Sequence, residues 1–196
     1  IKDLNEIKAV GHRVLHGGEI FAKAIIVGDE ELIQIESLKD LGPLHMPPNI
    51  MGIKACHSLM PNIPQMAIFD TAFHQTMPRS SYLYALPYEY YEKYRIRRYG
   101  FHGTSHRYVS NRAAQILGKN FNKLRMVTIH LGNGSSIAAI KDGACFDTSM
   151  CFTPLEGLVM GTRCGDIDPA IVSFLQEELK LTPHEVDNLL NKKSGF

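Results

Sequence analysis

The sequence predicts an α/β fold, and three observations support this prediction. Short apolar runs bounded by turn residues are typical of strands, and longer segments repeat their apolar residues at helical spacing. The two kinds of segment are mixed along the chain. With 196 residues, of which 44% are hydrophobic, the chain is long enough for one large domain or two small ones. We place a domain boundary near residues 71–76.

The first part of the chain is predicted to contain two strands and two helices. The strands are expected at residues 9–12 and 65–69, and the helices at residues 30–41 and 47–60. Pro47-Pro48 suits the first turn of the second helix, because proline lacks the backbone N–H that this turn leaves unpaired. Gly17-Gly18 is expected to turn the chain after the first strand.

The second part of the chain is predicted to contain a group of strands between helices. The strands are expected at residues 126–131, 136–140 and 145–147, and the helices at residues 104–117, 169–179 and from Thr182 onward. Thr104 or Ser105 can cap the first of these helices, and Gly118 can stop it. Asp142-Gly143 is typical of a hairpin turn. The Pro- and Tyr-rich residues 77–94 are expected to be irregular or helical in pieces.

Composition and charge argue against several classes of protein. The net charge is +1, so no strong field attracts nucleic acid or a membrane surface, and the basic run at residues 95–107 has no nucleic-acid-binding motif beside it. The longest apolar runs are far shorter than the roughly 20 residues of a membrane span. Four cysteines without a C-x-x-C pair indicate reduced thiols. We therefore expect a soluble cytoplasmic protein with neither a nucleic-acid partner nor a membrane.

A glycine-rich turn at residues 130–136, His-Leu-Gly-Asn-Gly-Ser-Ser, joins two predicted strands. Glycines at such a turn let backbone N–H groups approach a ligand and form an anion-binding concavity. No G-K-[ST] follows and no helix begins here, which argues against a Walker A loop and a dinucleotide-binding turn. A plain hairpin turn remains the alternative.

Four further residues are candidates for chemistry. Asp70 ends an apolar strand at the expected boundary, where it could hold Mg²⁺, orient a cation, or merely cap the strand. His102 lies between two glycines before a helix, whose N-terminus favours negative charge. Arg13 and Arg163 lie in Gly-flanked loops, from which a guanidinium can bind a carboxylate or phosphoryl oxygen, although each alone could form a structural ion pair.

Taken together, these segments resemble the acetate and propionate kinases over essentially the whole chain. The matching motifs lie at residues 12–18, 69–78, 99–106, 130–136 and 147–169, in the order found in that family. Five linked motifs are far more specific than any one of them. The resemblance implies an acetate kinase, which carries out reversible Mg²⁺-dependent phosphoryl transfer from ATP to acetate and so forms acetyl phosphate and ADP.

The resemblance also implies a fold, namely that of the sugar kinase, heat-shock chaperone and actin superfamily. We expect parts of two actin-like (ribonuclease H-like) domains, each with a mixed sheet flanked by helices. Residues 1–72 would be the C-terminal part of the first domain, on the acid-binding side, and residues 73–196 the N-terminal part of the second, on the phosphate and nucleotide side. The chain would then be an internal piece that lacks turnover by itself, and the full-length protein a homodimer.

By resemblance, the site residues fall into three groups. The catalytic positions are Asp70, His102, Arg163 and Arg13. The acid-binding positions are Arg13, Leu15, Leu44, His45, Phe101 and Pro154. The phosphate-binding turn contains His130, Leu131, Gly132, Asn133 and Gly134, and no metal ligand is assigned. Leu15 stands where the family usually has Val, and its larger side chain favours acetate over propionate.

The chemistry of the acid limits the roles of these residues. A simple carboxylic acid titrates near pH 4, so acetate is already ionised at neutral pH and needs no general base. Asp70 is therefore not expected to act as a base, and its remaining roles are to hold Mg²⁺ or to orient a neighbouring arginine. The alternatives are a propionate kinase, a non-catalytic nucleotide-binding relative, and a metal-dependent hydrolase that uses some of the nine histidines. The sequence contains no H-x-x-H or H-E-x-x-H motif, which argues against the hydrolase.

Overall fold

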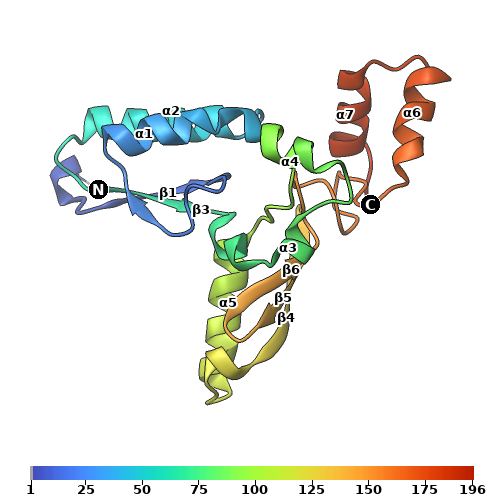
Figure 1. Cartoon of the computed structure of the whole chain (residues 1–196). Coiled ribbons are helices and arrows are strands. Elements are labelled where there is room, and N and C mark those ends of the chain that lie inside the picture. The colour runs from blue at the N-terminus through green and yellow to red at the C-terminus, as the bar shows by residue number, and fades with distance from the viewer. Residues whose placement is uncertain (1) are drawn as a thin grey trace.

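The computed structural model describes residues 2–196 and contains two three-stranded sheets flanked by helices (Figure 1). One sheet has the strand order β1-β3-β2 and is mixed, and the other has the order β4-β5-β6 and is antiparallel. The predicted α/β class is therefore confirmed. Among residues 2–196, no helix combines the length and the apolar character needed to cross a membrane.

The first sheet is built from the first 69 residues. β1 (Val10–Val14) pairs in parallel with β3 (Gln65–Phe69), and β2 (Ile25–Ile26) pairs antiparallel with the other edge of β3. Two helices, α1 (Asp29–Ser37) and α2 (Met46–Leu59), lie on one face of this sheet (Figure 1). The helix predicted at residues 30–41 is shorter than expected, because the chain leaves the α conformation at Leu38 and ends in a 3₁₀ turn.

The second sheet is a meander of three strands with one long helix beside it. Its strands are β4 (Arg125–Leu131), β5 (Ser135–Lys141) and β6 (Ala144–Thr148), and the helix is α5 (Gly103–Ile116). Asp142 and Gly143 both have positive φ, at 53° and 80°, which matches a type I′ hairpin turn. The predicted strands and turn are confirmed.

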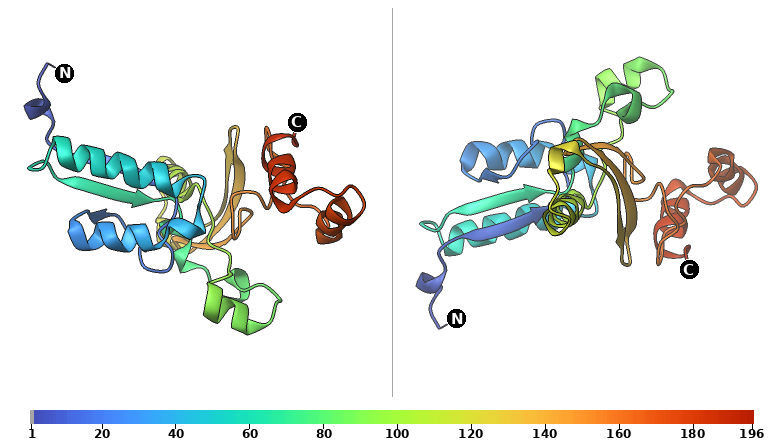
Figure 2. Two further views of the ribbon diagram at one scale, coloured as in Figure 1. Left: turned by 90° about the horizontal axis from the view of Figure 1, so that it is seen from above. Right: turned by 90° about the horizontal axis from the view of Figure 1, so that it is seen from below.

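The remaining helices are short or stand apart from the sheets. They are the 3₁₀ segments Leu4–Glu6, Lys39–Leu41, Ala72–Thr76 and Phe121–Lys123, and the helices α3 (Arg79–Tyr82), α4 (Tyr88–Tyr94), α6 (Pro169–Glu177) and α7 (Pro183–Lys192). The last two helices are capped by their own side chains, since Asp168 accepts from the N–H of Ala170 and Thr182 forms a capping box with Glu185. α6 and α7 form a pair that lies away from both sheets (Figure 2).

The basic run at residues 95–107 has a structural use. The guanidinium of Arg97 is nearly inaccessible, lies 3.8 Å from the ring centre of Tyr82, and donates to Glu19 at 2.8 Å. Arg98 donates to Asp147 at 2.7 Å. Two ion pairs thus connect the segment that follows α4 to Glu19 and Asp147, and a cation–π contact connects it to Tyr82.

The main hydrophobic core joins the first sheet to later segments. Val14, Ile35 and Phe69 from the first sheet and its helices share one buried cluster with Phe101 and Met160. Residues on both sides of the proposed boundary at residue 72 therefore pack together. The division into two domain parts stays a prediction.

Helix α5 begins at Gly103, one residue before the predicted start, and its N-cap precedes both predicted caps. Its N-cap is His102, with φ of 57°, and neither Thr104 nor Ser105 caps it. The reason is a tertiary contact, since the N–H of Gly103 donates to the carbonyl oxygen of Asp70 at 2.9 Å. A Cβ on Gly103 would lie only 2.3 Å from that oxygen. Only glycine lets the start of α5 approach the end of β3 this closely.

This contact makes Gly103 a test of the fold. Replacing Gly103 by Ala in the full-length protein should lower the free energy of unfolding by about 1–3 kcal/mol, because the methyl group meets backbone that cannot turn aside. The matched control is Gly52→Ala, which lies exposed in α2 with no atom near the added methyl group and should stabilise by about 0.5–1 kcal/mol. Urea denaturation measures both, and equal stabilities would contradict the proposed close approach.

Candidate active site

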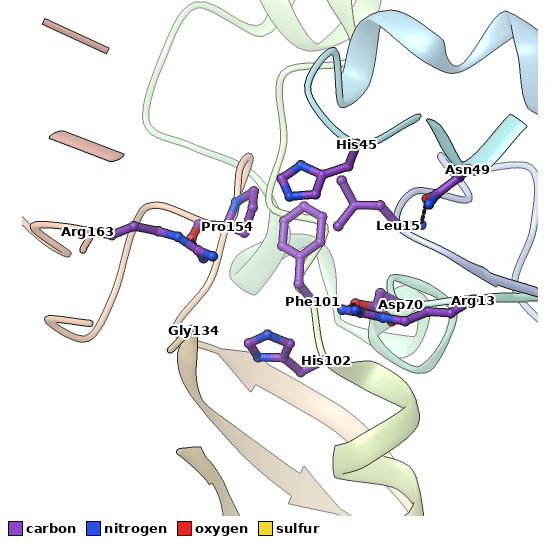
Figure 3. Close-up of a pocket in the computed structure, with 10 residues that line it drawn as sticks. All are labelled: Arg13, Leu15, His45, Asn49, Asp70, Phe101, His102, Gly134, Pro154 and Arg163. Atoms are coloured by element: carbon purple, nitrogen blue, oxygen red, sulfur yellow. Dashed lines mark hydrogen bonds and ion pairs between the residues drawn. The ribbon is translucent and has the colours of Figure 1, made fainter. Parts of the chain in front are cut away.

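A pocket opens where the end of the first sheet, the start of α5 and the loop after β6 meet (Figure 3). Its volume is about 240 Å³. Ten residues line it: Arg13, Leu15, His45, Asn49, Asp70, Phe101, His102, Gly134, Pro154 and Arg163. All of these except Asn49 are residues that the resemblance singles out. Segments more than a hundred residues apart in the chain therefore meet in one place.

Arg13 and Asp70 form a two-pronged ion pair at the floor of the pocket. The Nε and Nη2 atoms of Arg13 donate to the two carboxylate oxygens of Asp70 at 3.0 and 2.6 Å. The Asp70 side chain is 2% exposed, whereas that of Arg13 is 68% exposed. The hydrogen bonds with Asp70 raise the pKa of Arg13. A buried carboxylate thus holds an accessible, permanently charged guanidinium in one orientation.

Apolar side chains form one wall of the pocket. Leu15 and Phe101 are buried, and Pro154 faces them (Figure 3). The N–H of Leu15 donates to Oδ1 of Asn49 at 2.9 Å, so Asn49 fixes the backbone that carries Leu15. Sequence reasoning missed Asn49. The available signal was its spacing, four residues after His45, which places both on the same side of α2.

The structure does not bear out the placement of Leu44 in this pocket. Its side chain is 59% exposed and does not belong to the pocket lining. The cause is the turn before α2, where the N–H groups of His45 and Met46 both donate to the carbonyl oxygen of Gly42. This turn directs His45 into the pocket and leaves its neighbour Leu44 in solvent.

Arg163 and Arg13 lie on opposite sides of the pocket, and His45 lies beside Phe101 (Figure 3). Burial lowers the pKa of His45, and the charges of Arg163 and Arg13 lower it further. Burial also lowers the pKa of Arg163, but a guanidinium remains charged in proteins. Nη1 of Arg163 donates to the carbonyl oxygen of Pro154 at 2.7 Å. The pocket is therefore flanked by two cations and a neutral imidazole.

The loop that carries Arg163 is held by residues at the end of α7. The N–H of Cys164 donates to the carbonyl oxygen of Leu190 at 3.0 Å, and the hydroxyl of Thr162 donates to that of Asn191 at 3.1 Å. The N–H of Ser194 donates back to the carbonyl oxygen of Thr162 at 3.3 Å. Arg163 thus depends on α7 for its position, whereas Arg13 belongs to β1.

His102 occupies the edge of the pocket next to the glycine turn. Its ring stacks on that of His130 with centroids 4.1 Å apart, and its Nδ1 lies 2.9 Å from Oγ of Ser136. Burial, followed by the neighbouring His130, lowers the pKa of His102 to about 4. The ring is therefore neutral at pH 7, and its left-handed backbone fixes where it points.

The glycine turn between β4 and β5 lines a second hollow that adjoins the first. This hollow has a volume of about 710 Å³ and includes His130, Gly132 and Asn133 in its lining. The two cavities share four lining residues: Arg13, Asp70, His102 and Gly134. Leu131 lines neither, and it is 75% exposed, because successive residues of β4 point to opposite faces. A side-chain contribution of Leu131 to this hollow is not borne out.

Gly134 keeps the junction of the two cavities open. A Cβ at this position would lie 3.3 Å from Nε2 of His102 and 3.4 Å from Nη1 of Arg163. Among the described residues that line the two cavities, Asp70 is the only one with a carboxylate. Within residues 2–196, no three His, Cys, Asp or Glu side chains come close enough to form a metal site by themselves.

Comparison with known proteins gives a consistent result. Residues 1–196 match the Acetokinase family. The acetate kinases of Thermotoga maritima and Thermosipho africanus are each 64% identical over 195 residues, which is 100% of this chain and 48% of each relative. The chain thus spans about half the length of the curated relatives it matches.

Solved structures agree with this. The crystal structure of Porphyromonas gingivalis acetate kinase superposes with a TM-score of 0.95 at 52% identity and covers 100% of this chain and 49% of that one. A propionate kinase from Francisella tularensis superposes with a TM-score of 0.94 at 50% identity, over 98% of this chain and 50% of that one. The actin-like fold implied by the resemblance is confirmed. By sequence and by structure, the chain belongs to the acetokinase family.

Proposed function

We propose that the full-length protein is an acetate kinase, which transfers a phosphoryl group reversibly between ATP and acetate. The observation that carries this proposal is the pair of adjoining cavities that share Arg13, Asp70, His102 and Gly134. The smaller cavity suits a short carboxylic acid, and the larger lies beside a glycine turn suited to phosphates. The similarity to acetate kinases supports the same assignment.

The smaller cavity supplies what acetate needs. We propose that the carboxylate lies between the guanidinium groups of Arg13 and Arg163 and that the methyl group contacts Leu15, Phe101 and Pro154. An ionised carboxylate is already a nucleophile, so no base is required. Both oxygens of Asp70 accept from Arg13, which supports a role in orienting this arginine rather than in proton transfer.

Phosphoryl transfer depends mainly on alignment and on stabilising charge at the equatorial oxygens of the transferred group. Arg13, Arg163 and His102 surround the junction of the two cavities, where that group would pass. We assign them to this stabilisation. His45, neutral and next to both arginines, is a further polar contact for the acid.

The backbone N–H groups at Gly132, Asn133 and Gly134 would bind nucleotide phosphates. Mg²⁺ is usually held by one or two carboxylates, water and substrate phosphates, and Asp70 can supply one carboxylate at this junction. When bound, the ion would neutralise charge on the phosphates. The homodimer, the cytoplasmic location and the absence of membrane or nucleic-acid partners stay predictions, and the four free thiols favour a reducing compartment.

The assay that tests this proposal uses the full-length protein with ATP, Mg²⁺ and either acetate or propionate. Acetyl phosphate should form faster than propionyl phosphate. Faster turnover of propionate would establish the propionate kinase alternative, which the Francisella tularensis neighbour favours. Binding of ATP without turnover of either acid would establish a non-catalytic relative.

Arg163 and His102 should affect the chemical step more than acid binding. Changing either residue to Ala should lower kcat about 10²- to 10³-fold, because each would remove a donor that acts on the transition state. The KM for acetate should change much less. Arg112→Ala is the control, since Arg112 lies outside both cavities on α5 and bonds to Gln115. A rise in KM without loss of kcat would contradict the assignment.

Leu15 should set the size of the acid pocket. Leu15→Val should raise the ratio of kcat/KM for propionate to that for acetate by about 10-fold or more, because space for one methylene group is worth about 1–3 kcal/mol. Leu44→Val is the matched control and should leave the ratio unchanged, since this side chain lies in solvent. If Leu44→Val changes the ratio and Leu15→Val does not, our placement of the methyl pocket is wrong.

A further inference from the structure

A line of hydrogen bonds runs from His102 into the interior, away from the pocket. Nδ1 of His102 lies 2.9 Å from Oγ of Ser136, and the same hydroxyl lies 2.8 Å from Nε2 of His106. Nδ1 of His106 in turn lies 2.8 Å from Oγ1 of Thr128. Two sheet residues and two residues at the start of α5 are thereby joined in one chain of contacts.

The inner members of this chain are sealed from water. Ser136, His106 and Thr128 are 0%, 1% and 6% exposed. Burial lowers the pKa of His106 to about 4, as it does that of His102, so each ring carries a single N–H at pH 7. Each hydroxyl also has a single hydrogen. In such an environment every hydrogen needs an acceptor within the protein.

Only one direction of donation satisfies all four groups. If Nδ1 of His106 donated to Thr128, the hydroxyl hydrogen of Thr128 would have no acceptor, because His106 is its only side-chain partner among residues 2–196. A buried donor left unpaired costs about 1–3 kcal/mol. In the opposite direction, Thr128 donates to His106, His106 donates through Nε2 to Ser136, and Ser136 donates to Nδ1 of His102. Each hydrogen then has an acceptor.

The direction of this chain determines what His102 presents to the site. With Nδ1 accepting from Ser136, the single hydrogen of the ring must be on Nε2. Nε2 faces the junction of the cavities, since a Cβ on Gly134 would lie 3.3 Å from it and 3.4 Å from Nη1 of Arg163. An N–H there attracts an anionic oxygen, whereas a lone pair would repel it.

We propose that Ser136, His106 and Thr128 are positioning residues that hold His102 in the tautomer with its hydrogen on Nε2, so that the ring donates to an anionic oxygen at the junction. The identity of that oxygen as part of a transferring phosphoryl group rests on the proposed function. The assignment of the tautomer does not rest on the proposed function.

The tautomer can be read directly by NMR of the full-length protein labelled with ¹⁵N-histidine, with His102→Gln to assign the signals. At pH 7 the wild-type His102 should show a protonated Nε2 and an unprotonated Nδ1. Thr128→Val, which removes the hydroxyl but keeps the shape, should give a mixture of tautomers, and Thr128→Ser should restore the single form. A hydrogen on Nδ1 in the wild-type protein would overturn the proposal. This measurement needs no turnover, so it stands apart from the test of the acetate kinase activity.

Kinetics separate positioning from simple packing. Thr128→Val should lower kcat about 10-fold with the KM for acetate nearly unchanged, and Thr128→Ser should recover most of it. Ser136→Ala should cost about 10- to 100-fold. The double variant with Thr128→Val and Ser136→Ala should lose no more kcat than Ser136→Ala alone, because Ser136→Ala already breaks the line of hydrogen bonds. Ser110→Ala is the control, since the hydroxyl of this buried serine on α5 donates to the backbone of Arg107 and lies outside the line of hydrogen bonds. Equal losses of kcat for Thr128→Val and Thr128→Ser would overturn the proposal. Additive losses of kcat in the double variant would also overturn it.

Discussion

The structure depends on the way Asp70 is bound on three sides. Its N–H donates to the carbonyl oxygen of Val14, its own carbonyl oxygen accepts from Gly103, and its carboxylate accepts twice from Arg13. These contacts join β1, the end of β3 and the start of α5 at a single residue. A buried carboxylate is tolerated because it is paired and hydrogen-bonded, and the same pairing orients Arg13. One residue thus links the fold of the first sheet to the arrangement of the site.

The hydrogen bonds of a buried histidine, His74, hold the segment before α5 in place. The buried ring of His74 lies 2.8 Å from the carbonyl oxygen of Phe101 through Nε2 and 3.1 Å from the thiol of Cys145 through Nδ1. Burial lowers the pKa of His74 to about 4, so the neutral ring carries one hydrogen, and this hydrogen lies on Nε2, which faces the carbonyl acceptor. Nδ1 then faces the thiol of Cys145, which keeps its hydrogen because burial raises its pKa to about 12. The ring then donates to Phe101. In this way β6 fixes the backbone that carries both the apolar wall and His102.

Local signals in the sequence were sufficient for much of the fold. Asp142-Gly143 forms the expected turn, and a helix begins after Thr182 as expected, because each depends on neighbours in the chain. The start of α5 was misplaced because His102 adopts its left-handed conformation only through the contact of Gly103 with Asp70. Short-range patterns do not record such contacts.

The same limit applies to the site. Motifs and family resemblance identified most residues of the pocket, but Asn49 acts through a hydrogen bond to a residue 34 positions away. Ser136 and Thr128 likewise meet His106 only after the second sheet and α5 have packed together. Leu44 lies outside the lining of the pocket because the direction of a side chain in a turn depends on the local backbone, which the sequence does not specify.

The two arginines of the pocket belong to different parts of the fold. Arg13 lies in β1, and Arg163 lies in a loop that is hydrogen-bonded to the end of α7. The loop of Arg163 is also tied to the glycine turn, because the N–H of Gly161 donates to the carbonyl oxygen of Asn133 at 3.1 Å. An anion that bridges both guanidinium groups couples its own binding to the orientation of α7. By linkage, a contact on α7 that favours one orientation of the helix would change the affinity for that anion, and the anion would change the affinity for that contact by the same factor.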